Sequence, residues 1–291
     1  MPDARELPPD PMMAFDPRQI DVPFRMQPGL RRMHDGEPHL HALQPGSALC
    51  DEKRQVHAAG TSIASVPGFD ARAAIAAIWR QAAHDGLGHL SPDTPLALAF
   101  EQDLAVLDLD SGRVPWMCVC VPSGWDPQDK IGRDLLAIHA PVADAAALNQ
   151  RWPQLLRLLA GDGDWARQVW TISASPLHDR HPRRRPATPW PQTDDPEAFA
   201  RQCLLRTERQ SFFAVPAHDG GAIRQRIFTI RVQLQPLTDA VVEPVGAQRL
   251  LHALQSMSDA VLAYKGLAPA RARLLAWLSR RAVTGNGGFS V

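Results

Sequence analysis

The segment Leu204 to Phe213, LLRTERQSFF, carries three charged residues within a run that is typical of a β-strand. Alternate side chains of an extended chain point to opposite faces, so Arg206 and Glu208 share one face and Arg209 lies on the other. Because a buried arginine needs a partner, we expect at least one of the two to face a buried acid, a cofactor carboxylate or a polar ligand pocket. The alternative is an edge strand in which Glu208 forms a single salt bridge with an arginine.

A second candidate strand lies around residues 226–237. Its Phe228, Ile230 and neighbouring alternate residues form an apolar face, whereas Thr229 and Arg231 lie on the other, mostly polar side. If this strand pairs with the segment at 204–213, the sheet offers a polar face that holds Thr229, Arg231 and one of the two arginines of that segment. A solvated sheet face with cross-strand ion pairs explains the same pattern.

The segment KIGRDLLAIHAPV places His139 at the end of an apolar helical stripe. On a helix, Ile131, Leu135 and Ile138 share one face with His139, and Pro141 ends the helix. A haem needs one imidazole nitrogen presented from an otherwise apolar wall, so His139 is a candidate axial ligand. The alternative is a core histidine with its hydrogen bonds satisfied.

The elements that must position these residues indicate an α+β domain built on an antiparallel sheet, since strands and helices occur without regular βαβ alternation. The patterns predict helices at 70–85, 129–139, 143–159, 244–263 and 269–283, and strands within 96–109 and at 114–121, 165–173, 204–215 and 226–237. A loop rich in Pro, Arg and His, at 177–196, is predicted to be exposed or lid-like.

Composition excludes several classes of protein. The chain has 291 residues, with 31 Lys plus Arg against 31 Asp plus Glu, so no net charge recruits nucleic acid or an anionic membrane. No apolar run approaches the roughly 20 residues of a membrane span, and the acidic, Pro-rich start does not resemble a signal peptide. We therefore expect a cytoplasmic protein. The four cysteines form no CxxC pair and are predicted to be buried free thiols.

Several segments together resemble the α-subunit family of haem-dependent oxidative N-demethylases. The strongest matches are LLRTERQSFF and the following IFTIRVQLQPL at 227–237. In chain order, PFRMQPGL, EQDLAVL, VPSGWDPQDKIGRDLLAIHAPV, RQVWTI and AYKGL also match. A departure follows the ERQ motif, where the family tends to run TLxRLP and this chain reads SFFAVP before a longer turn. That departure puts the substrate in doubt more than the fold.

The resemblance implies a PAS-like antiparallel sheet flanked by helices, with N-terminal and C-terminal extensions. The expected organisation is a flexible segment at 1–22, one haem-binding domain at 23–283 and a flexible tail at 284–291. The implied activity is the oxidation of a small methylated amine by O₂, with haem b as cofactor. Electrons would come from a separate flavin and iron–sulfur reductase, because the chain has no recognisable flavin or iron–sulfur motif of its own.

The resemblance also implies roles for individual residues. His139 is expected to be the proximal ligand of the haem iron. Arg206, Glu208 and Arg209 would be catalytic, one arginine polarising bound O₂ while Glu208 holds a protonated amine or orients an arginine. Arg231, with Thr229 beside it, would bind the cofactor, for example through a haem propionate. The alternatives are a haem-based gas or redox sensor without turnover and a cofactor-free interaction subunit.

Overall fold

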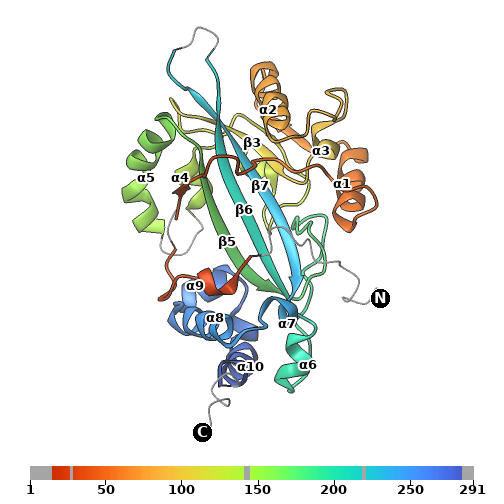
Figure 1. Cartoon of the computed structure of the whole chain (residues 1–291), viewed down its shortest axis with the longest axis vertical. Helices are drawn as coiled ribbons and strands as arrows, with labels where there is room; N and C mark the ends of the chain where they lie inside the picture. Colours follow the sequence, from red (N-terminus) through yellow and green to blue (C-terminus); the bar gives the residue numbers. More distant parts are fainter. Residues whose placement is uncertain (1–14, 27–28, 141–144, 218–220, 284–291) are drawn as a thin grey trace.

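The computed structural model describes residues 15–26, 29–140, 145–217 and 221–283, and for His139 and residues 145–151 it describes the backbone only. In these ranges the chain forms a sheet in the order β1-β5-β6-β7-β3-β4-β2, and every neighbouring pair of strands is antiparallel (Figure 1). Helices flank this sheet, so the prediction of an α+β fold is confirmed. The arrangement is consistent with a PAS-like sheet.

The strands are β1 (Arg31–Arg32), β2 (Ile63–Ser65), β3 (Asp103–Asp108), β4 (Trp116–Cys118), β5 (Trp165–Ser173), β6 (Leu204–Val215) and β7 (Gln225–Pro236). The α-helices are α1 (Ala48–Ala58), α2 (Arg72–His84), α3 (Leu96–Ala99), α4 (Leu135–His139), α5 (Ala145–Ala160), α6 (Pro196–Ala200), α7 (Leu237–Ala240), α8 (Pro244–Ser256), α9 (Asp259–Tyr264) and α10 (Arg271–Val283). Short 3₁₀-helices lie at Pro17–Gln19 (η1), Pro127–Asp129 (η2) and Ala268–Ala270 (η3).

The sheet has two differently covered faces. Residues paired directly across antiparallel strands share a face, which places Glu208 with Val169, Val232 and, further along, Phe228. We call this the α4 face, because Phe228 packs with Ile131, Leu135 and other residues from the α4 region. The other side is the α2 face, where Leu104 of β3, Phe213 of β6 and residues of α1 and α2 form one cluster.

The segment around residues 34–43 crosses β5, β6 and β7 in Figure 1 and lies on the α2 face, where His39 bonds to Ser211. At the far end of the sheet, α8, α9 and α10 pack against Ile172 and Leu205. Of the segment predicted to be flexible, residues 15–22 are described, and there Phe15 and Ile20 are buried in the same cluster. The tail at 284–291 lies outside the described residues.

Several sequence predictions hold closely. Strands β5, β6 and β7 agree with prediction within one residue at each end, and all four cysteines are free and buried. None of the helices in the described ranges combines the length and the hydrophobicity that crossing a membrane requires. The alternative interpretation of the segment 204–213 as an edge strand is wrong, because β6 pairs with β5 over nine residues and with β7 over its full length.

The predicted helix at 129–139 is divided. Residues up to Asp129 form η2, a turn follows, and α4 begins only after Asp134, whose side chain caps the nitrogen of Ala137. The reason is Gly132, whose φ of +71° is incompatible with a right-handed helix. Similarly, the predicted helix at 244–263 is divided into α8 and α9, and the start of the segment 96–109 is helical as α3.

Replacing Gly132 with alanine is expected to destabilise the fold by about 2 kcal/mol, combining left-handed strain with overpacking. A Cβ atom at this position would lie 2.9 Å from Cγ1 of Val66. Urea unfolding measures the loss of stability. Gly124→Ala is the matched control, since Gly124 has φ of +85° but its Cβ would meet nothing within 4 Å. If both variants lose equal stability, the contact with Val66 has no influence.

Candidate functional site

The residues predicted to form the site are divided between the two faces of the sheet. Arg206 and Glu208 point to the α4 face, the face on which the helix that ends at His139 packs. Arg209, Thr229 and Arg231 point to the α2 face, where Arg209 lies directly opposite Arg231 and Thr229 opposite Ser211. The structure therefore brings Arg206 and Glu208 together on one face and separates them from Arg209, Thr229 and Arg231 on the other.

Glu208 is the half-buried residue in the middle of a buried strand. Its neighbours along β6, from Leu204 to Thr207 and from Arg209 to Phe213, are all buried. Because β6 is an internal strand, the accessible part of the Glu208 side chain can be reached only from the α4 face. A carboxylate in this position is accessible to a ligand, whereas the side chains that flank it along β6 are buried.

One oxygen of Glu208 is held by Arg206 through Ser123. The guanidinium Nε and Nη2 of Arg206 donate to the hydroxyl oxygen of Ser123 at 2.9 and 2.7 Å. An arginine can only donate, so the hydroxyl proton of Ser123 is directed to Oε1 of Glu208. Arg206 also donates to the carbonyl oxygens of Leu177 and His178, at 3.2 and 2.8 Å. Burial lowers its pKa to about 10, which the charge of Glu208 opposes.

The other oxygen of Glu208 is held by Gln210 in a similar way. Nε of Arg167 donates to Oε1 of Gln210 at 2.7 Å, which fixes the orientation of the amide. The amide nitrogen of Gln210 then donates to Oε2 of Glu208 at 2.7 Å. Both carboxylate oxygens thus accept a hydrogen bond from a neutral donor that an arginine orients, and the carboxylate is rigidly positioned.

Further cations and a phenol surround this carboxylate. Glu208 acts electrostatically on Arg167, Arg180 and Lys265, and also on Tyr264 at the end of α9. Burial lowers the pKa of Lys265 to about 8, against the raising effect of Glu208. The ammonium of Lys265 donates to the carbonyl oxygen of Trp170 at 2.7 Å. Partial burial, followed by the charge of Glu208, raises the pKa of Tyr264, although this residue is 50% exposed.

Apolar side chains border the carboxylate on the α4 face. Val169 of β5 lies directly opposite Glu208, and Leu234 of β7 lies opposite the neighbouring Arg206. Both are half-buried, and neither belongs to the hydrophobic clusters that the described residues form. Two further half-buried residues lie on this side of β7: Ile230, opposite Gln210, packs against the cluster that contains Val232, and Phe228 packs against the cluster of the α4 region. Val232 lies opposite Glu208, and Phe228 lies four residues before it, so Phe228 is about 13 Å from the level of Glu208 along the strand.

The other candidates lie on the α2 face, where the two arginines form ion pairs but Nε and Nη1 of Arg209 are buried without a hydrogen-bond partner among the described residues. Arg209 is paired with Glu37 at 2.9 Å and Arg231 with Glu101 at 2.6 Å, and both arginine side chains are buried. The hydroxyl of Thr229 bonds to Ser211 at 2.7 Å. Arg209 therefore faces an acid, as expected for an arginine of LLRTERQSFF, although Glu37 is half-buried rather than buried. The catalytic role of Arg209 and the cofactor contacts of Thr229 and Arg231 stay predictions.

His139 is the last residue of α4, and its side chain lies outside the described residues. The helix itself is anchored, because Leu135 and Ile138 pack against the same buried cluster as Phe228, and the ammonium of Lys130 donates to the carbonyl oxygen of Ile138 at 3.1 Å. Helix and carboxylate therefore belong to the same face of the sheet.

The loop predicted to be exposed at 177–196 is buried in its first part. The carboxylate of Glu52 accepts hydrogen bonds from the backbone N–H groups of His178 and Asp179, and it lies 2.9 Å from Nδ1 of His178. Asp179 is completely buried and forms ion pairs with Arg184 and Arg185. The sequence pattern could not reveal this, because Glu52 is more than 120 residues away in the chain. Residues 182, 183 and 186–189 of the same loop are exposed.

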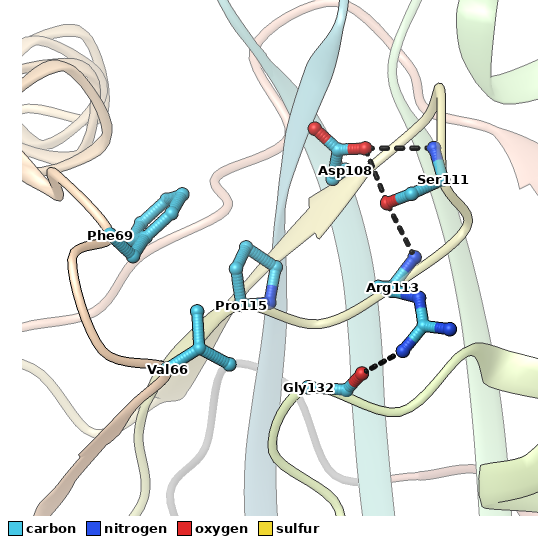
Figure 2. A pocket seen from close by; sticks show the side chains of 7 residues that line it. All are labelled: Val66, Phe69, Asp108, Ser111, Arg113, Pro115 and Gly132. Atoms are coloured by element: carbon cyan, nitrogen blue, oxygen red, sulfur yellow. Dashed lines mark hydrogen bonds between the residues drawn. The ribbon is translucent and has the colours of Figure 1, made fainter.

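A separate pocket of about 360 Å³ opens between the β3–β4 turn and the loop before α4 (Figure 2). Its apolar side consists of Val66, Phe69 and Pro115. The polar atoms opposite are bonded to one another, as Asp108 accepts from the Ser111 hydroxyl at 2.6 Å and Arg113 donates to the carbonyl of Gly132 at 2.8 Å. They are thus engaged within the turn and do not converge on a ligand.

Sequence reasoning missed several residues around Glu208. Ser123, Gln210, Arg167, Tyr264 and Lys265 all fall within segments that resemble the family, so those segments contained the signal. Arg180 lies in the loop that the sequence predicts to be exposed, and no local pattern distinguishes it from the other arginines there.

Fold and site together define an α+β protein with a rigidly held carboxylate among cations on one face of an antiparallel sheet. A family model described as haem-dependent oxidative N-demethylase, alpha subunit-like, matches residues 83–275, from the end of α2 into α10. The chain belongs to this family. The matched range includes β3 to β7, α4 and every residue that surrounds Glu208.

Proposed function

We propose that the protein is a haem-dependent oxidoreductase that uses O₂ to remove a methyl group from a small amine. The observation that supports this most directly is Glu208, a half-buried carboxylate with fixed orientation on the face that carries α4. A carboxylate on an apolar surface is the complement of a protonated methylamine, which has a charged N–H group and apolar methyl groups.

The residues present fit a haem. The half-buried apolar surface of Phe228 and Ile230 suits the face of a macrocycle, and Arg167 and Arg180 nearby suit its propionates. His139, at the end of α4, stays the predicted ligand of the iron. When bound, haem b supplies the centre at which O₂ is reduced.

In the proposed mechanism Glu208 accepts a hydrogen bond from the substrate ammonium. The hydrogen bonds from Ser123 and Gln210 hold the carboxylate in one orientation, so the amine is oriented as it binds. Val169 and Leu234 contact the methyl groups and exclude water from them. Lys265, whose pKa of about 8 lies near physiological pH, is suited to hold or release a proton at its Nζ atom beside this site.

The overall reaction balances as follows. One methyl group leaves as formaldehyde, which contains one oxygen atom of O₂, and the second oxygen atom leaves as water. Two electrons and two protons are consumed, and the amine gains a hydrogen in place of the methyl group. We propose that the electrons come from a separate flavin and iron–sulfur reductase.

The test combines the haem-loaded protein with NADPH, a ferredoxin and a ferredoxin reductase as surrogate electron donors. Addition of dimethylamine is expected to increase NADPH consumption and to produce formaldehyde in proportion to the amine consumed. A haem-based sensor would instead bind haem and respond spectrally to gases, with no formaldehyde. A folded protein that takes up no haem under oxidising or reducing conditions would refute the proposal.

A further inference from the structure

The guanidinium of Arg180 is not engaged by the protein in the way that the neighbouring guanidinium groups are. Its backbone nitrogen donates to the carbonyl oxygen of Pro122 at 3.0 Å, but its half-buried side chain forms neither a hydrogen bond nor an ion pair with any described residue. The neighbouring arginines of the same loop differ, because Arg183, Arg184 and Arg185 all form ion pairs with aspartates.

The backbone that carries Arg180 is fixed on both sides. Before it, the nitrogens of His178 and Asp179 donate to Glu52, and after it the ring of His181 lies 3.3 Å from a carboxylate oxygen of Asp126. These three loop residues are buried. A long side chain is therefore presented from a rigid base, which reduces the entropy lost when a ligand binds it.

The same contacts place Arg180 beside the site. Its backbone is bonded to Pro122, the residue before Ser123, and Arg206 donates to the carbonyls of Leu177 and His178 in the same loop. Glu208 is the carboxylate that acts on Arg180, and Arg180 in turn repels Arg206. Among the described groups Glu208 thus faces four cations, Arg167, Arg180, Arg206 and Lys265.

We propose that Arg180 binds a carboxylate group of a ligand at this site. The planar guanidinium presents parallel N–H donors that match a carboxylate in bidentate geometry. A second anion would also help to balance Arg167, Arg180 and Lys265, on which Glu208 is the carboxylate that acts, whereas Arg206 is near Glu52 and Asp103 as well. This inference rests on the proposed function, in which two ligands can supply the carboxylate. One is a haem propionate, and the other is an acid group on the amine substrate, as in an N-methylated amino acid.

The first arm of the test compares haemin with haemin dimethyl ester, in which both propionates are esterified. The apo-protein is titrated with each and the Soret band is followed. If Arg180 binds a propionate, Arg180→Gln weakens haemin binding roughly 10- to 100-fold and leaves the affinity for the ester unchanged. Arg180→Lys, which keeps the charge but not the bidentate geometry, is expected to lose less.

The second arm compares N-methylglycine with dimethylamine as ligands of the haem-loaded protein, using difference spectra to measure the dissociation constants. If Arg180 binds a substrate carboxylate, the unmodified protein binds N-methylglycine more tightly than dimethylamine. Arg180→Gln then weakens the binding of N-methylglycine roughly 10- to 100-fold and leaves that of dimethylamine unchanged. Binding of haemin and its ester would then be the same in both proteins. Arg183→Gln is the matched control from the exposed side of the loop and should alter neither arm.

The inference is overturned if Arg180→Gln has the native fold by circular dichroism and yet leaves both the affinity for haemin and the affinity for N-methylglycine unchanged. Since the Arg180 side chain bonds to no described residue, this variant is expected to fold. If the protein binds no haem, the proposed function fails separately. Calorimetric titration of the apo-protein with N-methylglycine then decides about Arg180, because equal affinity in both proteins would exclude a carboxylate site.

Discussion

Replacing His139 with alanine is expected to remove the Soret band of the haem-loaded protein or to shift it strongly. An axial imidazole contributes directly to iron binding, so the loss of haem affinity should exceed the 10- to 100-fold typical of outer-shell substitutions at metal sites. α4, which ends at His139, packs through Leu135 and Ile138 on the same face of the sheet as Glu208. Haemin titration with absorption spectroscopy measures the effect.

Two controls separate a ligand from a structural histidine. His84→Ala removes an exposed imidazole from the end of α2 and should leave the spectrum unchanged. External imidazole is expected to restore the Soret band of the His139→Ala variant, because it can occupy the space of the missing ring. If the variant binds haemin with unchanged affinity and spectrum, another residue holds the iron.

The second large effect is expected from Glu208→Gln, which should lower kcat/KM for dimethylamine on the order of 100-fold while haem stays bound. Glutamine keeps the size of the side chain and an oxygen for Ser123, but it removes the negative charge that a substrate ammonium needs. In this variant the pKa of Lys265 should fall further below about 8, since the charge of Glu208 raises it. Formaldehyde production measures the first change, and NMR of ¹³C-labelled lysine side chains measures the second.

Glu101→Gln is the matched control for this substitution. Glu101 pairs with Arg231 on the α2 face, so its replacement should reduce thermal stability but leave the KM for dimethylamine unchanged. If Glu101→Gln and Glu208→Gln impair turnover equally, the α2 face takes part in catalysis. That outcome would favour the predicted contacts of Thr229 and Arg231 with the cofactor.

The strands and the charged segment could be predicted from sequence because they depend on local patterns. Alternation of side chains along 204–215 places Arg206 and Glu208 on one side and Arg209 on the other, and β6 has this arrangement. At 129–139, by contrast, the helical spacing of Ile131, Leu135 and Ile138 predicts one continuous helix, whereas the structure has η2, a turn and α4. The positive φ of Gly132, and the closeness of Val66 to the place where a Cβ atom of residue 132 would lie, are not visible in that spacing.

The assignment of the arginines to their partners depends on contacts between distant segments. Arg209 donates to Glu37 and Arg206 donates to Ser123, and these partners lie 172 and 83 residues away in the chain. Alternation predicts that the two arginines point in opposite directions, but it does not say which direction leads toward α4. Only the packing of α4 against Phe228 decides that.

The sequence by itself determined the family, the antiparallel α+β architecture and the carboxylate between two arginines in LLRTERQSFF. The tertiary structure decided that β6 is an internal strand, that Glu208 is its half-buried residue and that Arg180 belongs to the same group of charges. The physical reason is that periodicity follows from the backbone of a single segment. Burial and ionic partners, in contrast, depend on which distant segments the folded chain brings together.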